Sequence, residues 1–402
     1  MEEKALNKIR CGFAQNKITP QLDYSTFLDG FGFRTKAVTE ILSDLYVKVC
    51  SFTFGNEHFL IAQFDLIGFS DEIYNIITSQ ISSIVNVDKT NIALNCIHTH
   101  SAPTTGILKY LPIDYDYLYY VGQVAGLTAK TAMENATTGS FNAQILDKEL
   151  TNTINRRGRN IIDRKIKCMT FVDEIGQVKG TLCSASCHPV INRVDKVSAD
   201  FLSVLNAESK NDSPIIFLQG NCGDIKPLLD ETLSMEEKIQ IFGHQLTEPI
   251  VETIKKAKFT KFLQGKPTIN FEQVTLPMKA YDTLEEETLM VKDLEKQYYD
   301  LPYNSSEKHV SLHRLIWHRN ALEKIKNKEL PRITVPLQIF SLDRQCAFVF
   351  VPFELLTLTA KKLEAILLNK GFDLAGIYIL GYSNSVNGYL AHPKKYHLAV
   401  TK

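Results

Sequence analysis

The chain has 402 residues, a length that favours two to three domains of about 150 residues each. Its 44% hydrophobic and 22% charged residues, with only 20 glycines and 14 prolines, exclude collagen-like and low-complexity proteins. Lys and Arg balance Asp and Glu at 45 residues each, so net charge gives the chain no bulk attraction to nucleic acid or to an anionic membrane.

Strands and helices alternate along most of the chain, which predicts an α/β fold. Apolar runs and alternating patterns predict strands at 46–54, 58–67, 91–97, 165–171, 180–186, 215–218, 333–339, 347–351 and 377–380. Apolar residues at helical spacing predict helices at 71–85, 117–134, 236–258 and 356–367, the last ending near Gly371. A polar, Lys- and Glu-rich stretch at about 283–328 is also helical in pattern, and we interpret it as a helical excursion that forms a lid or a partner surface.

The sequence contains no apolar run of about 18 residues, which predicts no membrane span. The charged segment 1–20 lacks the apolar stretch of a secretory signal, so we expect a cytoplasmic protein. The cysteines lie in apolar stretches, and we expect buried, reduced thiols rather than a disulfide framework. They are Cys11, Cys50, Cys96, Cys168, Cys183, Cys187, Cys222 and Cys346.

Polar side chains follow several predicted strands at the point where each strand ends. In open α/β sheets ligands bind beyond the carboxyl ends of strands, so these side chains are candidates for one site. The candidates are His98, His100, His188, Asn221, Asp224, Glu354 and residues 384–389. The run 220–224 allows close backbone approach to a ligand or forms a plain turn, and it lacks the Lys-Ser/Thr of a phosphate-binding loop.

His98 and His100 are two residues apart, so in an extended segment both imidazoles point to one face. Two neutral imidazoles on one face suit zinc, although a hydrogen-bonded histidine pair fits the same pattern. Cys183 and Cys187 also have zinc-like spacing, but His188 has the opposite strand parity, which disfavours one site for all three. Glu354 fits either a site or the acidic first turn of a helix.

Taken together, seven segments resemble, in order and spacing, the neutral/alkaline (non-lysosomal) ceramidase family of zinc-dependent amidases. The most specific is NIALNCIHTHSAP at 91–103, which is similar to the strand and T-H-T-H-S-x-P motif of the family. The others are Ile18-Thr19-Pro20, 30–34, Asn155-Arg156, Cys187-His188-Pro189 with 198–200, Pro352-Phe353-Glu354, and 381–389 with Tyr396. The resemblance covers nearly the whole chain. It implies a single large catalytic domain over 1–402, with mixed β-sheets flanked by helices.

The resemblance also implies a ligand set and a mechanism. Carried over position by position, the zinc ligands are His98, His188, Glu354 and Tyr389, with Tyr382 as the alternative fourth ligand. His100 becomes an acid/base or supporting group, and Arg156 steadies a developing oxyanion or a substrate carboxylate. Asn221 and Asp224 are the expected substrate-binding residues.

One departure from the family changes the expected chemistry. Lys226 stands where the family has its nucleophilic serine, in the segment 223–228. We therefore expect direct attack of zinc-bound water on an amide or ester carbonyl, with Lys226 either stabilising the oxyanion or simply solvated. Because the sequence ends at Lys402, soon after the last family-like segment, and begins without an apolar stretch, we expect neither the immunoglobulin-like domain of long family members nor an export signal. A small or N-acylated substrate is therefore expected rather than ceramide.

Two other functions stay open at this point. The missing serine allows a non-catalytic zinc-binding homologue that acts as a binding or scaffold protein. The polar excursion at about 283–328 allows a zinc-free scaffold that binds a partner. The sequence gives no indication of the oligomeric state.

Overall fold

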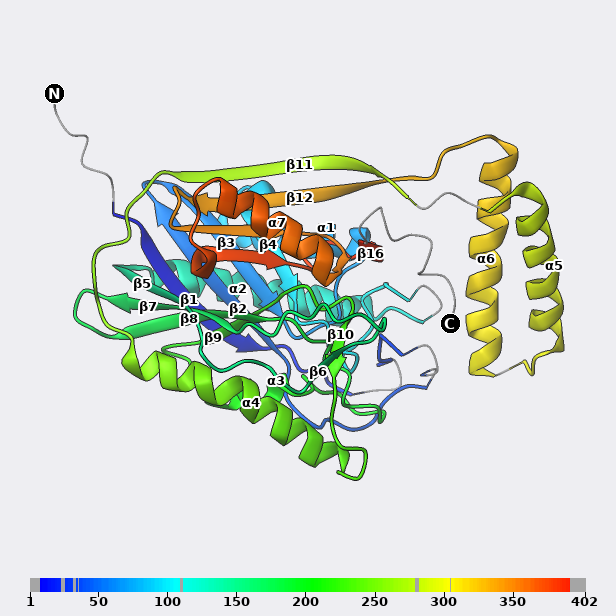
Figure 1. Cartoon of the computed structure of the whole chain (residues 1–402), viewed down its shortest axis with the longest axis horizontal. Coiled ribbons are helices and arrows are strands. Elements are labelled where there is room, and N and C mark those ends of the chain that lie inside the picture. Colours follow the sequence, from blue (N-terminus) through cyan, green and yellow to red (C-terminus); the bar gives the residue numbers. More distant parts are fainter. Residues whose placement is uncertain are drawn as a thin grey trace.

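The computed structural model describes residues 8–22, 26–31, 34, 36–108, 111–278, 282–303 and 305–390. The described residues form four layers, in which two β-sheets pack against each other and helices cover both outer faces (Figure 1). The predicted α/β fold with mixed sheets flanked by helices is therefore confirmed. Gly32, Phe33 and Tyr396 of the family-like segments lie outside the described residues.

The larger sheet has eight strands in the order β4-β3-β2-β1-β5-β7-β8-β9. Its strands are β1 (Arg10–Lys17), β2 (Tyr46–Phe54), β3 (Glu57–Phe64), β4 (Ile92–Cys96), β5 (Thr137–Ile145), β7 (Lys167–Asp173), β8 (Val178–Ala185) and β9 (Ile215–Gln219). Only the pairs β3–β4 and β8–β9 are parallel. The smaller sheet has the order β11-β12-β13-β15. Its strands are β11 (Pro267–Pro277), β12 (Arg332–Leu342), β13 (Cys346–Phe350) and β15 (Ile377–Leu380).

Two short pairs of strands lie beside these sheets. One is β6 (Thr153–Asn155) with β10 (Ile225–Pro227), and the other is β14 (Glu354–Leu355) with β16 (Tyr389–Leu390). The helices are α1 (Asp71–Val85), α2 (Tyr115–Glu134), α3 (Leu202–Glu208), α4 (Met235–Lys256), α5 (Leu284–Asp300), α6 (Ser306–Lys326) and α7 (Thr357–Asn369). Among the described residues no helix is both long and apolar enough to cross a bilayer.

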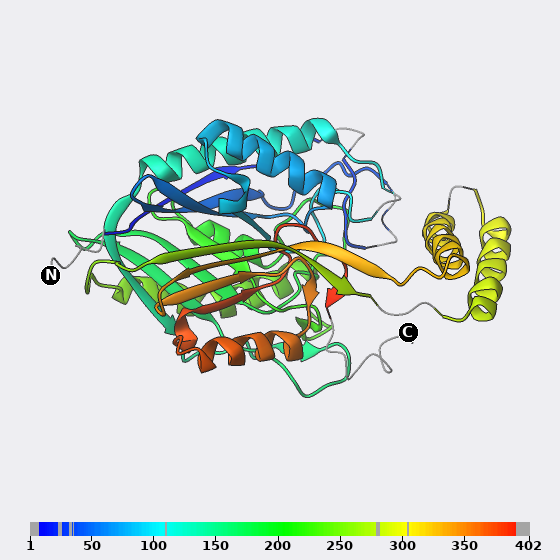
Figure 2. The same ribbon diagram turned by 90° about the horizontal axis from the view of Figure 1, so that it is seen from above.

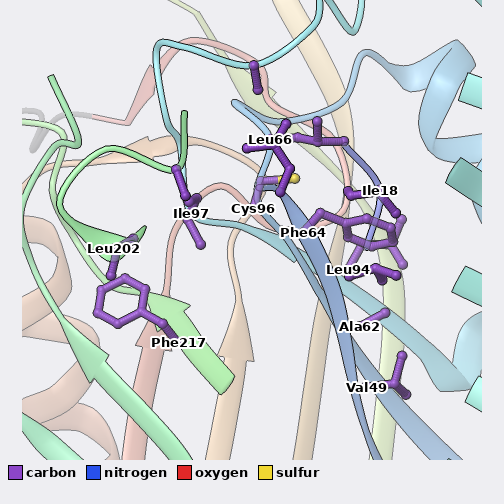
Figure 3. Packing of buried hydrophobic residues seen from close by; sticks show 14 of the residues in the cluster. Ile18, Val49, Ala62, Phe64, Leu66, Leu94, Cys96, Ile97, Leu202 and Phe217 are labelled. Atoms are coloured by element: carbon purple, nitrogen blue, oxygen red, sulfur yellow. The ribbon is translucent and has the colours of Figure 1, made fainter. Parts of the chain in front are cut away.

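Apolar side chains on both faces of the larger sheet hold the layers together. One face packs against α1 to α4, where Phe64, Leu94 and Phe217 belong to the buried cluster drawn in Figure 3. The other face meets the smaller sheet, and Phe59 stacks on Phe340 with ring centroids 4.3 Å apart. The far face of the smaller sheet packs against α7. All eight cysteines are buried free thiols in these layers.

The helices α5 and α6 form a hairpin in the interval where the sequence predicts a helical excursion. Figures 1 and 2 both show this hairpin standing away from the layered body, at the end of the β11–β12 ribbon. It has a small core of its own, formed by Val291, Leu294 and Leu315. That the whole chain forms one domain stays a prediction.

Candidate metal centre

The candidate site lies beyond the carboxyl ends of strands from both sheets. His98 follows β4, His188 follows β8, and Glu354 follows β13 after a short turn. The backbone of His98 has a φ of +68°, and its N–H donates to the carbonyl of Leu66 over 2.9 Å. After this turn the His98 ring lies beside the rings of His100 and His188, with both centroid distances at 4.9 Å.

Three imidazoles meet there. One ring nitrogen of each of His98, His100 and His188 lies within 4.8 Å of the others. The Nε2 atoms of His98 and His100 are 3.3 Å apart. His98 and His188 are buried, and His100 is half-buried. The structure thus brings together the two histidines predicted as ligands and the third predicted as a supporting group.

Hydrogen bonds to backbone carbonyls fix two of these rings. Nδ1 of His98 contacts the carbonyl of Ile67 at 2.6 Å, and Nδ1 of His188 contacts the carbonyls of Ile225 at 3.1 Å and Cys222. A proton on each Nδ1 leaves the Nε2 lone pair for a ligand, as in metal-binding histidines. The buried Nε2 of His188 has no hydrogen-bond partner within the described chain.

The charge states of the cluster suit a cation. Burial lowers the pKa of His98 to about 3 and also lowers the pKa of His100 well below its ordinary value. Burial opposes ionisation of Glu354, but the neighbouring His188 and His98 outweigh it and lower its pKa to about 2. At neutral pH the imidazoles of His98 and His100 are therefore neutral and lie beside a carboxylate.

Glu354 lies between the two predicted histidine ligands. Its Oε2 is 3.6 Å from Nε2 of His98 and 3.4 Å from Nε2 of His188. Nitrogen and carboxylate donors at this separation are the set that zinc takes in proteins. Nε2 of His188 has no hydrogen-bond partner and faces the ionised carboxylate of Glu354. His98, His188 and Glu354 therefore fit a divalent metal ion.

Both candidate tyrosines reach Glu354. Parallel pairing of β14 with β16 places Tyr389 directly beside Glu354. The buried Tyr382 donates to Oε2 of Glu354 over 3.4 Å and lies 3.2 Å from the thiol of Cys222. Burial raises the pKa of both hydroxyls. The choice of Tyr389 over Tyr382 as fourth ligand stays a prediction.

Arg156 lies on the same side of the cluster as Tyr389. Its Nη2 donates to the Tyr389 hydroxyl over 2.6 Å and lies 3.9 Å from Oε2 of Glu354. The side chain also donates to the carbonyl of Gly223 over 3.0 Å. With about 29% of its side chain exposed, Arg156 can also face a molecule in the site.

The predicted substrate-binding residues have partners inside the fold. Asp224 accepts hydrogen bonds at Oδ2 from Asn155 and at Oδ1 from the backbone and hydroxyl of Thr357. The amide oxygen of Asn221 accepts from Ser186, while its buried Nδ2 has no partner within the described chain. Asp224 is therefore placed as a positioning residue, and substrate binding by either residue stays a prediction.

Lys226 lines a different cavity from the imidazole cluster. It lies on β10 opposite Ile154 of β6, and the cavity that it lines also contains Arg193 and Lys238. Its part in catalysis stays a prediction. The thiols of Cys183 and Cys187 contact backbone carbonyls, and neither belongs to a metal-binding group among the described residues.

Two supporting residues received no role in the sequence analysis. Arg34 is buried and donates to the carbonyls of His100, Asn192 and Val194, so it joins the two histidine segments. Gly30 has a φ of +100° and packs directly against the ring of His100. Both residues lie in the family-like segment 30–34. The match of this glycine and arginine to the family motif is the sequence signal that could have pointed to their supporting role.

No protein-family model and no curated protein matches the sequence. Several solved structures match the fold, and two of them are ceramidases. The crystal structure of neutral ceramidase from Pseudomonas aeruginosa has a TM-score of 0.73 and 14% identity, covering 98% of this chain and 70% of that one. A ceramidase complexed with C2 has a TM-score of 0.69 and 14% identity, covering 96% and 70%. The predicted resemblance to ceramidases is thus confirmed for the fold, while the lost serine and missing domain stay predictions.

Proposed function

We propose that this protein is a zinc-dependent hydrolase that cleaves an amide or ester bond of a small or N-acylated substrate. The observation that carries the proposal is the buried, unpartnered Nε2 of His188, which faces the Glu354 carboxylate and lies beside His98 and His100. A buried polar atom without a partner is rare in a folded protein, and a bound cation would satisfy it. The ceramidase-like fold supports an acyl-transfer reaction at this position.

In this proposal His98, His188, Glu354 and Tyr389 hold the zinc ion. Zinc at such a site supplies a Lewis acid that polarises a carbonyl group and lowers the pKa of a water molecule towards neutrality. The eight buried thiols are consistent with a reducing compartment, and we place the protein in the cytoplasm on the sequence evidence.

The remaining residues of the site act on the substrate. His100 holds an unpartnered Nδ1 and lies 3.3 Å from His98, so it can accept a proton from water and return it to the leaving group. Arg156 presents guanidinium donors on the Tyr389 side, where they would stabilise negative charge on the carbonyl oxygen of the scissile bond. Arg34 keeps the His100 segment in place.

The test is metal analysis combined with hydrolysis assays on the same samples. We expect about one zinc ion per chain by plasma mass spectrometry, and cleavage within a panel of N-acyl amides and aryl esters. Removing the metal with a chelator should abolish cleavage, and added zinc should restore it. His188→Ala should lose metal and activity, whereas His244→Ala, on the exposed side of α4, should keep both.

Two results would count against the proposal. A protein that neither contains nor binds zinc would remove its basis. A protein that binds zinc but cleaves no member of the panel, also as Lys226→Ser, would instead be the non-catalytic homologue. That second function is favoured by the lysine at the position where the resemblance places the serine.

A further inference from the structure

A second cavity lies beside the candidate metal centre and is not part of it. Its volume is about 290 Å³, which is near the lower end for small-molecule sites. One wall is the segment that follows His188, and the other is formed by residues that follow Ile225 and by the start of α4. The mechanism proposed above makes no use of this cavity.

Part of the lining is apolar. Val190, Ile191 and Val194 contribute from the segment after His188, and Leu229 and Met235 face them from the other wall. Aliphatic side chains at the surface of such a cavity favour a ligand with an apolar portion, because contact removes apolar area from water.

The charged part of the lining is strongly unbalanced. Arg193, Lys226 and Lys238 face a single carboxylate, that of Glu231. Lys238 is paired with Glu231 at 3.0 Å. Neither the Arg193 nor the Lys226 side chain makes a hydrogen bond or ion pair with any residue in the described part of the chain, and both act on Glu231 only through longer-range charge. Two cations are thus left for a ligand, and Lys226 is half-buried, so its charge is less screened than on an open surface.

The cavity shares its walls with the metal centre. The carbonyl of Ile225, next to Lys226, accepts from both the backbone N–H and Nδ1 of His188. The carbonyl of Pro189, next to Val190, accepts from the N–H of His100 over 3.3 Å. A ligand in the cavity would therefore lie against the two segments that fix the catalytic imidazoles.

We propose that this cavity binds the negatively charged group of the substrate, so that the substrate is an acyl amide or ester carrying a carboxylate beside an apolar portion. That the cavity is a substrate subsite rests on the proposed hydrolase function. This subsite gives Lys226 a role in recognition and accounts for a cation at the position where the sequence resemblance places a serine. A neutral substrate would leave both cations without a partner.

The kinetic test compares N-hexanoylglycine with the uncharged N-hexanoylglycinamide, using the zinc-loaded protein. We expect kcat/KM for the carboxylate to exceed that for the amide by about tenfold, as for charge-assisted recognition. The double variant Lys226→Gln/Arg193→Gln should bring that ratio close to one, mainly through KM. Lys256→Gln removes one charge from the exposed end of α4 and should leave the ratio as in the wild type.

A binding test separates this inference from the proposed function. The probe is 1-octanesulfonate, which contains no hydrolysable bond, with 1-octanol as the neutral reference, and binding is followed by calorimetry. If the sulfonate binds to the wild type but at least about tenfold more weakly to the double variant, the anion site stands, even if no substrate is cleaved. If both hexanoyl compounds are cleaved with equal kcat/KM and the sulfonate binds no more tightly than octanol, the anion site is overturned while the hydrolase stands. Circular dichroism shows whether each variant is folded. If the double variant does not fold, the single variants Lys226→Gln and Arg193→Gln are tested in its place.

Discussion

Gly30 shows how tightly the segments around the imidazole cluster are packed. A Cβ atom at this position would lie 2.5 Å from Cγ of His100, and the φ of +100° is unfavourable for any residue with a side chain. We therefore expect Gly30→Ala to destabilise the fold by about 1–3 kcal/mol and to displace His100, with a loss of activity of at least about tenfold. Thermal unfolding and hydrolysis rates would measure the two effects.

Gly55 provides the matched control for this change. It also has a positive φ, of +63°, but a Cβ atom there would meet nothing within 4 Å. Gly55→Ala therefore introduces backbone strain without the clash. Equal activities of Gly30→Ala and Gly55→Ala would show that the contact between Gly30 and His100 does not affect activity.

Glu354 is the only carboxylate within the metal-binding cluster as the structure describes it. Glu354→Gln keeps the shape of the side chain and removes its negative charge. We expect zinc affinity to fall by at least about 10–100-fold, because even groups that only support metal ligands have effects of that size. Competition with a fluorescent zinc chelator measures the affinity directly and does not depend on turnover. As a control, Glu248→Gln removes an exposed carboxylate on α4 and should leave the zinc affinity unchanged.

At the scale of elements, Asp224 connects three separate parts of the structure. Its carboxylate accepts from Asn155 at the end of β6 and from the backbone N–H of Thr357, the first residue of α7. Leu356 precedes α7 and offers no capping side chain, so Asp224 takes that role from a distant position in the sequence. Glu354 lies three residues before Thr357, and the cap therefore also fixes the strand that carries the carboxylate ligand.

We expect Asp224→Ala to lower the free energy of unfolding by about 2–4 kcal/mol, because several buried donors lose their acceptor. The loss should be present without metal or substrate and is measured by urea denaturation of the metal-free protein. Asp224→Asn keeps one carbonyl acceptor and should lose less. A metal-free Asp224→Ala protein as stable as the wild type, with raised KM, would assign Asp224 to substrate binding instead.

The elements that could be predicted from sequence are those with one clear periodicity. The strand Tyr46–Phe54 and the helix Asp71–Val85 match their predicted bounds, because a buried face gives each a regular apolar pattern. The strand Pro267–Pro277 is not predicted, because its alternation of apolar and polar residues breaks at Glu272 and Gln273 and it is held in place by pairing with β12. The seven-residue helix α3 is likewise too short to show a period.

For the site, the sequence indicated the residue types but not their arrangement. Histidines and a glutamate after strand ends suggested a metal, and the structure does bring His98, His188 and Glu354 together. The internal hydrogen bonds of Asp224 and the separate cavity of Lys226 depend on contacts between distant segments. No spacing rule within a single segment gives such contacts.

At the scale of the whole molecule, the α5–α6 hairpin is the part least connected to the rest. Its small core is its own, and the strands leading to it remain paired up to Pro277 and Arg332. We expect replacement of residues 283–328 by a short Gly-Asn turn to leave zinc content unchanged and to shift the melting temperature by only a few degrees, about 2–4 °C. Metal analysis and calorimetry test this. An insoluble or metal-free product would contradict this expectation and would show that the layered body needs the hairpin to fold.

The buried Lys48 predicts how stability varies with pH. Burial lowers its pKa to about 8 from an ordinary value of 10.5, although Asp65 nearby opposes the shift. Between these two values the unfolded chain keeps the proton that the folded protein has lost, so the free energy of unfolding should rise with pH over this interval. Relative to Lys48→Met, the wild type should gain about 2 kcal/mol between pH 8 and pH 10. Urea denaturation at both pH values measures this difference, in which the titration of the cysteines cancels. A constant or falling difference would contradict it.

The distribution of the metal-binding residues along the chain also has a consequence for biosynthesis. A ribosome makes His98 early and His188 later, but Glu354 and Tyr389 only after all strands of the larger sheet, which ends with β9 at Gln219. Until then the two histidines have no carboxylate partner, and the parallel pairing of β14 with β16 cannot form. If the proposed ligand set is right, zinc loading would follow translation of these residues. A nascent chain arrested before Glu354 would present its histidines to the cell without the carboxylate that we propose as a ligand.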